Sequence, residues 1–487
     1  MPGGLIQLAV YGGQDYYFTS NPQISFFKSV YRRYTNFSME LINIVPTMSN
    51  KSLGLSQDTT ITFTINRHGD LFKDVYFVFT LPDIYSNNTY NFQWIHRIGE
   101  YIIKNVDFNI GGRKIDSHYG EWLHIWSELT TDASKISGYY EMIGNLPELY
   151  DPALANTNGG TYPSATAVIP SIRGRNIYVP LRFWFNESYG AAFPLIATQY
   201  DSEPQIVLTL RPILDLYTIT DPNNNNYRVA PNPNISAHNI GNFLSYNSTN
   251  QSVSSLDIVP NMEANYIFLD RDERKRFALS EHEYLIRQIQ IVQDQFIPGT
   301  FNNDTRTLDL KVQHPTASLY WVLRRSDLEL ANQWSNFINW PDPTKPPNYY
   351  PATYNPFGNE ADLNNPANYI PVVEKNLVQS GALLLNGINR FDTKSHEFFN
   401  LINPYQHQPR ISQDSGIYGY SFGLENDASK YQPSGSCNMS RFNKIQLQLG
   451  VLQRAPNTTY DYRIYVFVMN YNIFRILGGL GDVEFSS

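Results

Sequence analysis

The two halves of this chain repeat the same series of strand-forming segments, and this duplication is the strongest constraint on the fold. Residues 194–210 and 433–449 are of equal length, open with a proline-led loop and end in strict alternation of apolar and polar residues. Such alternation is typical of a half-buried strand, with one face on a core and the other outward. The two segments lie about half a chain length apart, so we interpret them as equivalent strands of two similar domains.

Four further pairs of segments recur in the same order, which accident does not readily produce. They are residues 60–79 and 307–323, 106–123 and 382–399, 178–185 and 417–424, and 265–270 and 463–470. Gly111-Gly112 and Asn386-Gly387 stand where a two-residue turn requires positive φ, so both predict tight β-hairpins. Many short strands with Gly, Pro and Asn turns, in a chain with 14% aromatic residues, predict an all-β sandwich or barrel architecture.

The spacing of the repeats is uneven, which indicates an insertion in each half. The polar segments 221–255 and 333–372 are rich in Asn and Pro and have no periodicity of their own. Long segments of this kind are usually surface loops with a function. Their roles stay open at this point.

The length of 487 residues favours two domains of roughly 200 residues each. We predict an N-terminal arm over residues 1–50 with a short helix near 24–33, a first domain over 51–270, a helical linker over 271–283, a second domain over 284–477 and a tail over 478–487. The linker is the most charged run in the chain. We expect Asp272, Arg274 and Phe277 to fix the two domains, with Phe277 and Leu279 docked between them.

The overall charge of −8 argues against direct packaging of nucleic acid, which requires a basic surface. The arm is the exception, because residues 1–39 contain three basic residues, Lys28, Arg32 and Arg33, and only one acidic residue, Asp15. These cations are candidates for contact with an anionic surface; the alternative is a solvated or internally paired face. The single cysteine, Cys437, excludes a disulfide framework. The N-terminus has neither a basic start nor a long apolar run, so we expect no signal peptide.

Motifs for catalysis or metal binding are weak. The three-residue spacing of His118, Glu121 and His124 would place them on one helical face, where they could hold a metal. Because Trp122 and Trp126 lie in the same segment, a packed connecting helix is the favoured interpretation. His282-Glu283 begins like a zinc-protease helix, but the second histidine of that motif is missing, and no phosphate-binding glycine loop precedes a helix. We therefore expect no enzymatic activity, no metal and no cofactor.

Several segments carry a specific resemblance to a known family. GGLIQLAVYGGQDYYFTSNPQISFFKSVYRRYTNF near the N-terminus, FPLIATQYDSEPQIVL, YIFLDRDERKRFALSEHEYLI, YQPSGSCNMSR and NYNIFRILGGLG resemble the major capsid proteins of nucleocytoplasmic large DNA viruses. Val10, Gly13 and Ser20 depart from the usual family residues, and the two inserted loops carry no resemblance.

This resemblance implies two consecutive eight-stranded jelly rolls with short connecting helices. It also implies a homotrimer with a pseudo-hexagonal outline that tiles an icosahedral shell over an internal membrane, assembled in the host cytoplasm. Neighbouring capsomers and minor capsid proteins would be its partners. The arm would face inward, which makes Asn21, Lys28, Arg32 and Arg33 candidate contacts to minor capsid proteins or membrane.

Other functions remain open from the residues alone. A jelly roll that binds carbohydrate, host glycans or a receptor could stack sugars on exposed aromatic residues such as Trp340 and Tyr349. A glycoside hydrolase and a penton or minor capsid paralogue are further alternatives, although such paralogues usually carry one jelly roll. The Asn-x-Ser/Thr sequons at Asn87, Asn247, Asn250 and Asn303 are candidate glycosylation sites.

Overall fold

The computed structural model describes residues 3–47, 52–86, 89–155, 160–221, 227–248, 251–296, 305–339, 375–427, 430, 432–453 and 460–485. The chain forms two compact units, Met1–Phe37 and Ser38–Ser487. In the first unit, helices α1 (Gly3–Ala9) and α2 (Asp15–Thr19) bury none of their residues. The predicted helix near residues 24–33 is wrong, since only a turn forms there. Its aromatic and β-branched residues are poor helix formers without packing.

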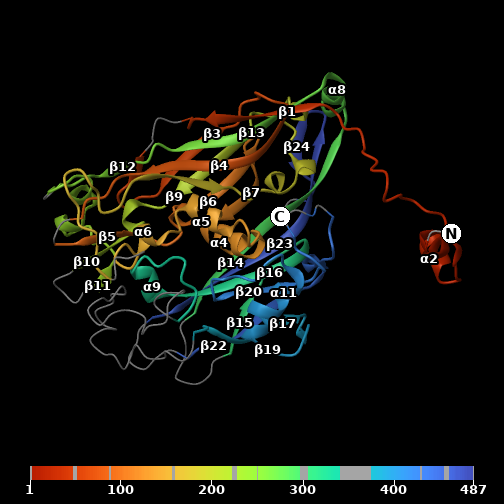
Figure 1. Cartoon of the computed structure of the whole chain (residues 1–487). Coiled ribbons are helices and arrows are strands. Elements are labelled where there is room, and N and C mark those ends of the chain that lie inside the picture. Colours follow the sequence, from red (N-terminus) through yellow and green to blue (C-terminus); the bar gives the residue numbers. More distant parts are fainter. Residues whose placement is uncertain are drawn as a thin grey trace. The chain divides into compact units, whose positions relative to one another are not determined.

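The first half of the second unit is built mainly from two four-stranded sheets (Figure 1). One has the strand order β1-β13-β4-β8 and the other β3-β9-β6-β7. Their bounds are β1 Phe37–Ile44, β13 Asn261–Leu269, β4 Leu71–Leu81, β8 Arg175–Pro180, β3 Thr59–Thr64, β9 Gln205–Leu210, β6 Ile103–Ile110 and β7 Arg113–Tyr119. Two small sheets join β11 (Tyr227–Val229), β10 (Tyr217–Asp221) and β5 (Asn91–Trp94), and β12 (Ser255–Asp257) with β2 (Ser52–Gly54). We call β1 to β13 the first sandwich.

The second half repeats this order with a few added strands. One sheet follows β14-β23-β16-β20, with β21 and β24 attached, and the other follows β15-β22-β17-β18, with β19 attached. Their bounds are β14 His282–Phe296, β23 Tyr462–Leu477, β16 Pro315–Arg325, β20 Ile417–Ser421, β21 Cys437–Asn438, β24 Leu480–Val483, β15 Thr305–Asp309, β22 Ile445–Val451, β17 Val378–Leu385, β18 Ile388–Asn389 and β19 Lys394–Ser395. We call β14 to β24 the second sandwich.

The predicted duplication is confirmed strand by strand. The matched segments become β3 and β15, β4 and β16, β6 and β17, β8 and β20, β9 and β22, and β13 and β23, and each pair has the same neighbours in its sheets. The two predicted hairpin turns are confirmed as well. Gly111 and Gly112 have φ of +57° and +76°, and Asn386 and Gly387 have φ of +50° and +81°, which two-residue hairpins with a primed turn require.

Short helices connect the strands. They are α3 Ile98–Tyr101, α4 Gly120–Thr130, α5 Ile136–Ile143, α6 Pro147–Tyr150, α7 Trp184–Glu187, α8 Arg271–Leu279, α9 Ser326–Leu330, the π-helix η7 Phe398–Ile402 and α11 Asn403–His407, with 3₁₀ turns η1 Tyr189–Ala191, η2 Leu195–Ala197, η3 Ile213–Asp215, η4 Ser236–His238, η5 Ile240–Phe243 and η8 Met439–Arg441. The longest described helix is α4. It lies between β7 and β8 in the chain, and its residue Trp122 packs against Tyr320 and Phe467 of the second sandwich.

In the sheet β14-β23-β16-β20, the central strands β16 and β23 are buried on both faces. Along β16, Leu319 and Trp321 belong to the core of the second sandwich, whereas Tyr320 and Val322 belong to the core of the first. Alternate residues of a strand point to opposite faces, so one sheet serves two cores. A continuous buried run in β16 follows from this arrangement, and the two sandwiches form one packed body.

The sequence-based boundaries shift slightly once the strands are placed. The strand β1 begins at Phe37 and lies beside β13, so a strand of the first sandwich falls within the segment expected as an arm. At the other end, β24 pairs with β23 through Leu480 opposite Leu477. The final residues therefore close a hairpin instead of forming a free tail.

Candidate functional site

The inter-domain seam, by which we mean the contact surface between the first and the second sandwich, gathers most of the buried charge of the described chain. Its apolar part is α4, whose residues Gly120 to Leu129 are buried. The rings of Trp122 and Trp126 stack 5.1 Å apart, and Trp122 lies 5.7 Å from both Tyr320 and Phe467 of the second sandwich. Aromatic groups of this size bury a large apolar area, so α4 anchors the two halves to each other.

The alternative of a metal site on this helix is not supported. His118 lies in strand β7 and not on the helix, and it pairs with Asp116 at 3.0 Å. Glu121 pairs with Arg211 at 3.0 Å, and His124 pairs with Asp414 at 2.8 Å. Each of the three side chains therefore has its own partner. Among the described residues, no group of three or more His, Cys, Asp or Glu side chains is arranged to hold a metal ion.

Arg97 is the centre of an ionic cluster at the seam, in which Arg97, Glu100 and Glu128 are buried. Its guanidinium contacts Glu100 at 2.5 Å, Glu128 at 2.8 Å and Asp414 of the second sandwich at 3.3 Å. The backbone of Arg97 is left-handed, with φ of +54°, a strained conformation that a non-glycine residue keeps only when its surroundings hold it. Here the three carboxylates supply that hold.

The same cluster includes hydroxyl groups and a second cation. Tyr139 donates to Glu100 at 2.6 Å and Tyr140 donates to Glu128 at 2.7 Å, while Arg410 of the second sandwich lies 3.3 Å from Glu128. Burial and the neighbouring carboxylates raise the pKa of both tyrosines above its usual value. The hydroxyls consequently remain donors, which buried carboxylates require.

The carboxyl of Asp414 is held in its ionised form. Burial opposes ionisation, but the hydrogen bond to His124, the charge of His124 and the guanidinium of Arg97 outweigh burial and hold the pKa of Asp414 well below its usual range. A carboxylate stabilised by neighbouring cations in this way is a structural ion-pair partner. It is not available as a general base with a pKa near neutrality.

A second buried cluster surrounds Arg324 in β16. Its guanidinium contacts Glu329 at 2.8 Å, Glu121 of the first sandwich at 3.4 Å and the Tyr465 hydroxyl at 2.7 Å. The Trp334 ring lies between this group and Arg211 of the first sandwich, 5.3 Å and 4.4 Å from the two guanidinium carbons. Both sandwiches thus contribute charges to the same desolvated network.

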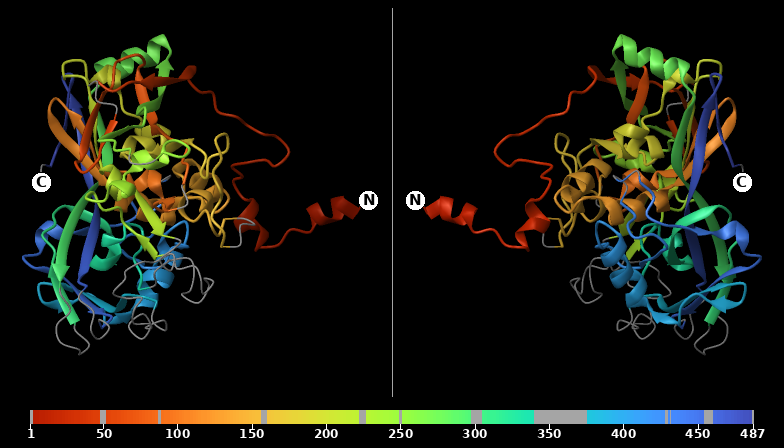
Figure 2. Two further views of the ribbon diagram at one scale, coloured as in Figure 1. Left: turned by 90° about the vertical axis from the view of Figure 1, so that its left-hand side faces the viewer. Right: turned by 90° about the vertical axis from the view of Figure 1, so that its right-hand side faces the viewer.

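The seam continues at the far end of the long strands β14 and β23. Glu187 of α7 lies 3.5 Å from Arg287 of β14, and burial raises the pKa of Glu187 to about 7 because Arg287, His118 and Arg182 offset burial only in part. Beside it, the β23–β24 hairpin lies along the β6–β7 hairpin (Figure 2), where Arg113 contacts Asp482 at 2.7 Å. The seam is therefore fixed along its whole length.

The predicted linker residues are placed mainly on the first sandwich. In α8, Arg274 pairs with Asp70 at 2.9 Å, Asp272 is exposed, and Phe277 packs near Leu71 and stacks on His282, the first residue of β14. The expectation that Leu279 docks between the domains is wrong, because its side chain is 85% exposed. The helix ends at Leu279, and that residue lies on its solvent face.

The other predicted site residues do not come together. Asn21, Lys28, Arg32 and Arg33 are exposed residues of the first unit. Among the sequons, Asn247 is exposed with φ of +55°, whereas Asn87, Asn250 and Asn303 lie outside the described residues. Trp340 and Tyr349 also lie outside them.

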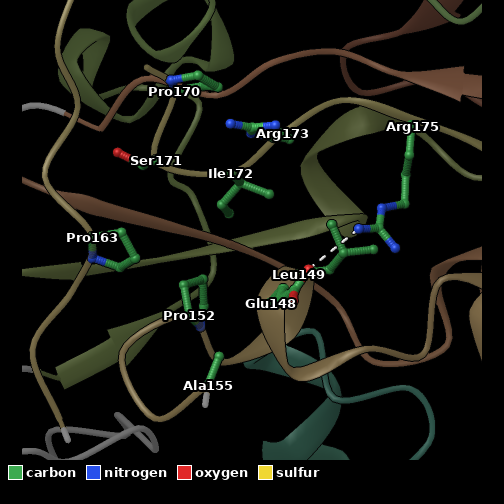
Figure 3. A pocket seen from close by; sticks show the side chains of 10 residues that line it. All are labelled: Glu148, Leu149, Pro152, Ala155, Pro163, Pro170, Ser171, Ile172, Arg173 and Arg175. Carbon is green, nitrogen blue, oxygen red and sulfur yellow. Dashed lines mark hydrogen bonds and ion pairs between the residues drawn. The ribbon is translucent and has the colours of Figure 1, made fainter. Parts of the chain in front are cut away.

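One pocket of about 240 Å³ lies in the first sandwich beside α6. Figure 3 shows Pro152, Pro163 and Pro170 around it, with Glu148 directed toward Arg175, and the two charged groups are 3.3 Å apart. The ten described residues that line this pocket include no histidine, no cysteine and no second carboxylate. It offers neither an acid–base pair nor a set of metal ligands.

Sequence reasoning missed the charged residues of the seam. Arg97 and Asp414 are 317 residues apart, and no local pattern links them. The one available signal is that Arg97 and Glu100 interrupt an apolar run, WIHRIGEYII, where unpaired charges are costly to bury. None of the described helices is both long and apolar enough to cross a membrane.

Comparison with known proteins identifies the family. A family model described as the major capsid protein N-terminus matches residues 25–270, and one described as the large eukaryotic DNA virus major capsid protein matches residues 273–482. The major capsid protein of Phaeocystis pouchetii virus is 31% identical, and the match covers 100% of both chains.

Solved structures agree with this result. A chain of the quasi-atomic model of the PBCV-1 virus capsid has a TM-score of 0.66 and 26% identity, covering 95% of this chain and 100% of that chain. The Faustovirus major capsid protein, 14% identical, has a TM-score of 0.64 over 96% of this chain and 94% of that chain, which supports the fold alone. The fold is a double jelly roll, and the ionic seam joins its two halves. The protein is a structural capsid component and not an enzyme, and it belongs to the family of large eukaryotic DNA virus major capsid proteins.

Proposed function

We propose that this chain self-assembles into a homotrimer with a pseudo-hexagonal outline, and that these capsomers tile the icosahedral outer shell of a large double-stranded DNA virus. The observation that carries the proposal is the matched strand order of the two sandwiches. Three copies would bring six similar sandwiches into one ring. A nearly six-sided block can tile a surface evenly, which explains why a capsid protein would contain the same sandwich twice.

The rigidity of the seam supports this function. A tile keeps its shape only if its two halves do not rotate against each other, and buried ion pairs of good geometry fix one arrangement in preference to others. Arg97 with Asp414, and Arg324 with Glu121, join the two halves directly. Contacts between tiles can then be individually weak, since each tile meets several neighbours at once.

The domain roles follow the strand positions. The first jelly roll would begin with β1 at Phe37 and end before α8, which serves as the linker, and the second would run from β14 to the β23–β24 hairpin. The preceding residues would form the inward arm, where Lys28, Arg32 and Arg33 contact minor capsid proteins or the internal membrane. Loops 221–255 and 333–372 would face outward, where host glycans or a receptor are met. Assembly would take place in the host cytoplasm.

Purified protein tests the proposal directly. We expect native mass spectrometry to give a trimer and electron microscopy to show a three-fold particle with a six-sided base. A protein that stays monomeric at all concentrations, or forms only two-fold particles, would contradict the proposed capsomer.

A deletion tests the arm. Removing residues 1–30 leaves β1 intact, so trimers should persist while shell assembly fails. The triple charge reversal Lys28→Glu, Arg32→Glu and Arg33→Glu should impair shell assembly in the same way, because like charges repel an anionic or acidic partner. Loss of soluble trimers in either variant would show that the arm has a different role.

A further inference from the structure

The structure contains one complete contact between a first and a second sandwich. In that contact, α4 follows β7 of the first sandwich and packs on the sheet β14-β23-β16-β20 of the second, on the face that carries Tyr320 and Phe467. Residues Tyr284 and Ile286 of β14 are buried on the same side. The contact is head-to-tail, because one sandwich contributes a helix and the other contributes a sheet face.

The corresponding sheet face of the first sandwich is open to a partner. In β1, Ile42 and Ile44 pack toward the core of the first sandwich, so Met39 and Leu41 lie on the opposite face of the strand. Both are exposed, Leu41 by 54%. On the same face, Tyr76 of β4 and Tyr178 of β8 are half-buried. In the second sandwich, α4 covers the equivalent sheet face. We call the uncovered face of the first sandwich, which carries Met39, Leu41, Tyr76 and Tyr178, the acceptor face.

The counterpart of α4 in the second sandwich is also exposed. The segment η7–α11 lies in the chain between β19 and β20, as α4 lies between β7 and β8. It carries exposed apolar side chains at Leu401, Ile402 and Tyr405, the last of them 78% exposed. Leu424 is exposed beside them, and its carbonyl lies 3.0 Å from His407 Nδ1. We call these four residues the donor patch.

From these two unpartnered surfaces we infer that the donor patch of one copy docks on the acceptor face of the next copy, repeating between chains the contact that α4 makes within the chain. The inference rests on the proposed trimer and deepens it by naming the surfaces that meet. The occupant is a second copy of this chain, because the chain itself shows what covers a face of this kind. A head-to-tail contact closes into a ring when its rotation allows, and a ring of three copies would contain six alternating contacts of two related types.

The two contact types should differ in strength. The contact within the chain includes Trp122 and the Arg97 cluster, in which Arg97, Glu100 and Glu128 are buried. The acceptor face instead carries polar side chains on its central strand, with Asn261, Glu263 and Asn265 only partly buried. A surface that is exposed before assembly must keep the monomer soluble, so mixed polarity is expected there and not at the seam.

Two charge substitutions test the inference. Leu41→Glu damages only the acceptor face and Tyr405→Glu damages only the donor patch. By analytical ultracentrifugation at micromolar concentration, each variant alone should be monomeric, while the wild type and the matched control Val168→Glu, at another exposed apolar residue, should be trimeric. An equimolar mixture of the two variants should give a one-to-one heterodimer, because each partner retains the surface that the other lacks.

The outcomes separate this inference from the proposed function. Trimers that persist in both charge variants, or a mixture that yields no heterodimer, would overturn the assignment of the surfaces while leaving the trimer standing. A wild type that never forms trimers would overturn the proposed function as well. If a charge variant loses its folded thermal transition, Leu41→Ser and Tyr405→Ser replace the pair. For each serine variant, the protein concentration at which half of the trimer has dissociated should be at least about tenfold higher than for the wild type. An unchanged midpoint concentration would overturn the inference.

Discussion

His124 Nε2 lies 2.8 Å from Asp414 Oδ2, although the two residues are 290 positions apart and belong to different jelly rolls. The other ring nitrogen of His124 lies 2.9 Å from the Tyr101 hydroxyl, so the imidazole is held from both sides. Because Asp414 also contacts Arg97, this carboxylate connects the second jelly roll to two separate segments of the first. Its removal should weaken the whole seam.

Substitution Asp414→Asn should lower the free energy of unfolding by about 2–4 kcal/mol, since it removes the carboxylate charge that pairs with both Arg97 and His124. Urea unfolding followed by tryptophan fluorescence measures this effect. The exposed pair of Lys104 and Asp58 provides a control, and Asp58→Asn should cost less than about 1 kcal/mol. Equal effects of the two substitutions would contradict the role given to the buried network.

The same carboxyl gives a pH dependence with a definite sign. The pKa of Asp414 is lower in the folded protein than its usual value of 3.8, so its ionised form stabilises the fold above that pH. The contribution is lost as the pH falls below it. In wild-type protein the free energy of unfolding should therefore drop more steeply in acid than in Asp414→Asn, and parallel acid profiles would count against this assignment.

Glu187 should show the opposite dependence. Burial raises its pKa from 4.5 to about 7, so the folded state favours the protonated form. This contribution is fully present below about pH 4.5 and disappears as the pH rises through 7, with a size of up to about 3 kcal/mol at 1.36 kcal/mol per pKa unit. The variant Glu187→Gln should therefore be more stable than wild type at pH 8 and gain little at pH 4.5. Arg287 keeps its hydrogen bonds to the carbonyls of Asp427 and Lys430 in that variant.

Urea unfolding at the two pH values measures the difference. The substitution Glu281→Gln, at an exposed position of the same region, controls for the general loss of one negative charge. If Glu187→Gln and wild type keep the same stability difference at both pH values, Glu187 is not the titrating group.

The linker helix provides a matched pair of substitutions two residues apart. Phe277→Ala removes a ring that packs near Leu71 and stacks 5.2 Å from His282, and it should cost about 1–2 kcal/mol. Leu279→Ala removes an exposed side chain and should change stability by less than about 0.5 kcal/mol. Thermal denaturation of the two variants compares them directly. A larger loss of stability for Leu279→Ala would contradict the finding that α8 packs on the first sandwich through Phe277 and exposes Leu279 to solvent.

Two glycines separate backbone strain from lack of space. Gly387 and Gly416 both have positive φ, +81° and +91°. A Cβ at Gly387 would meet no atom within 4 Å, whereas one at Gly416 would lie 2.3 Å from the carbonyl oxygen of Phe337. Gly387→Ala should cost about 1 kcal/mol from strain alone.

Gly416→Ala should cost about 1–3 kcal/mol more, because the backbone of Phe337 has to move. The Phe337 ring stacks on His124, so this displacement should reach the seam. Chemical denaturation of both variants provides the measurement, and equal costs would show that the backbone at Phe337 yields freely.

Much of the architecture could be predicted from the sequence. The alternating residues of β9 and β22, the repeated order of the segments and the turns at Gly111-Gly112 and Asn386-Gly387 predicted a duplicated β fold, and the charged run before β14 predicted a helix. These features depend on strand periodicity and turn conformation, which are local properties of the chain. The helix expected near residues 24–33 failed because weak local helix propensity decides nothing without packing.

The contacts of the seam were decided by tertiary structure alone. The pairing of Arg97 with Asp414, and of Arg324 with Glu121, depends on how α4 lies on the outer face of the sheet that contains β16. The same placement explains why β16 is buried on both faces. Local periodicity specifies which side chains share a face of a strand, but it does not specify which distant surface covers that face. The sequence by itself determined two sandwiches, and packing determined how one is fixed to the other.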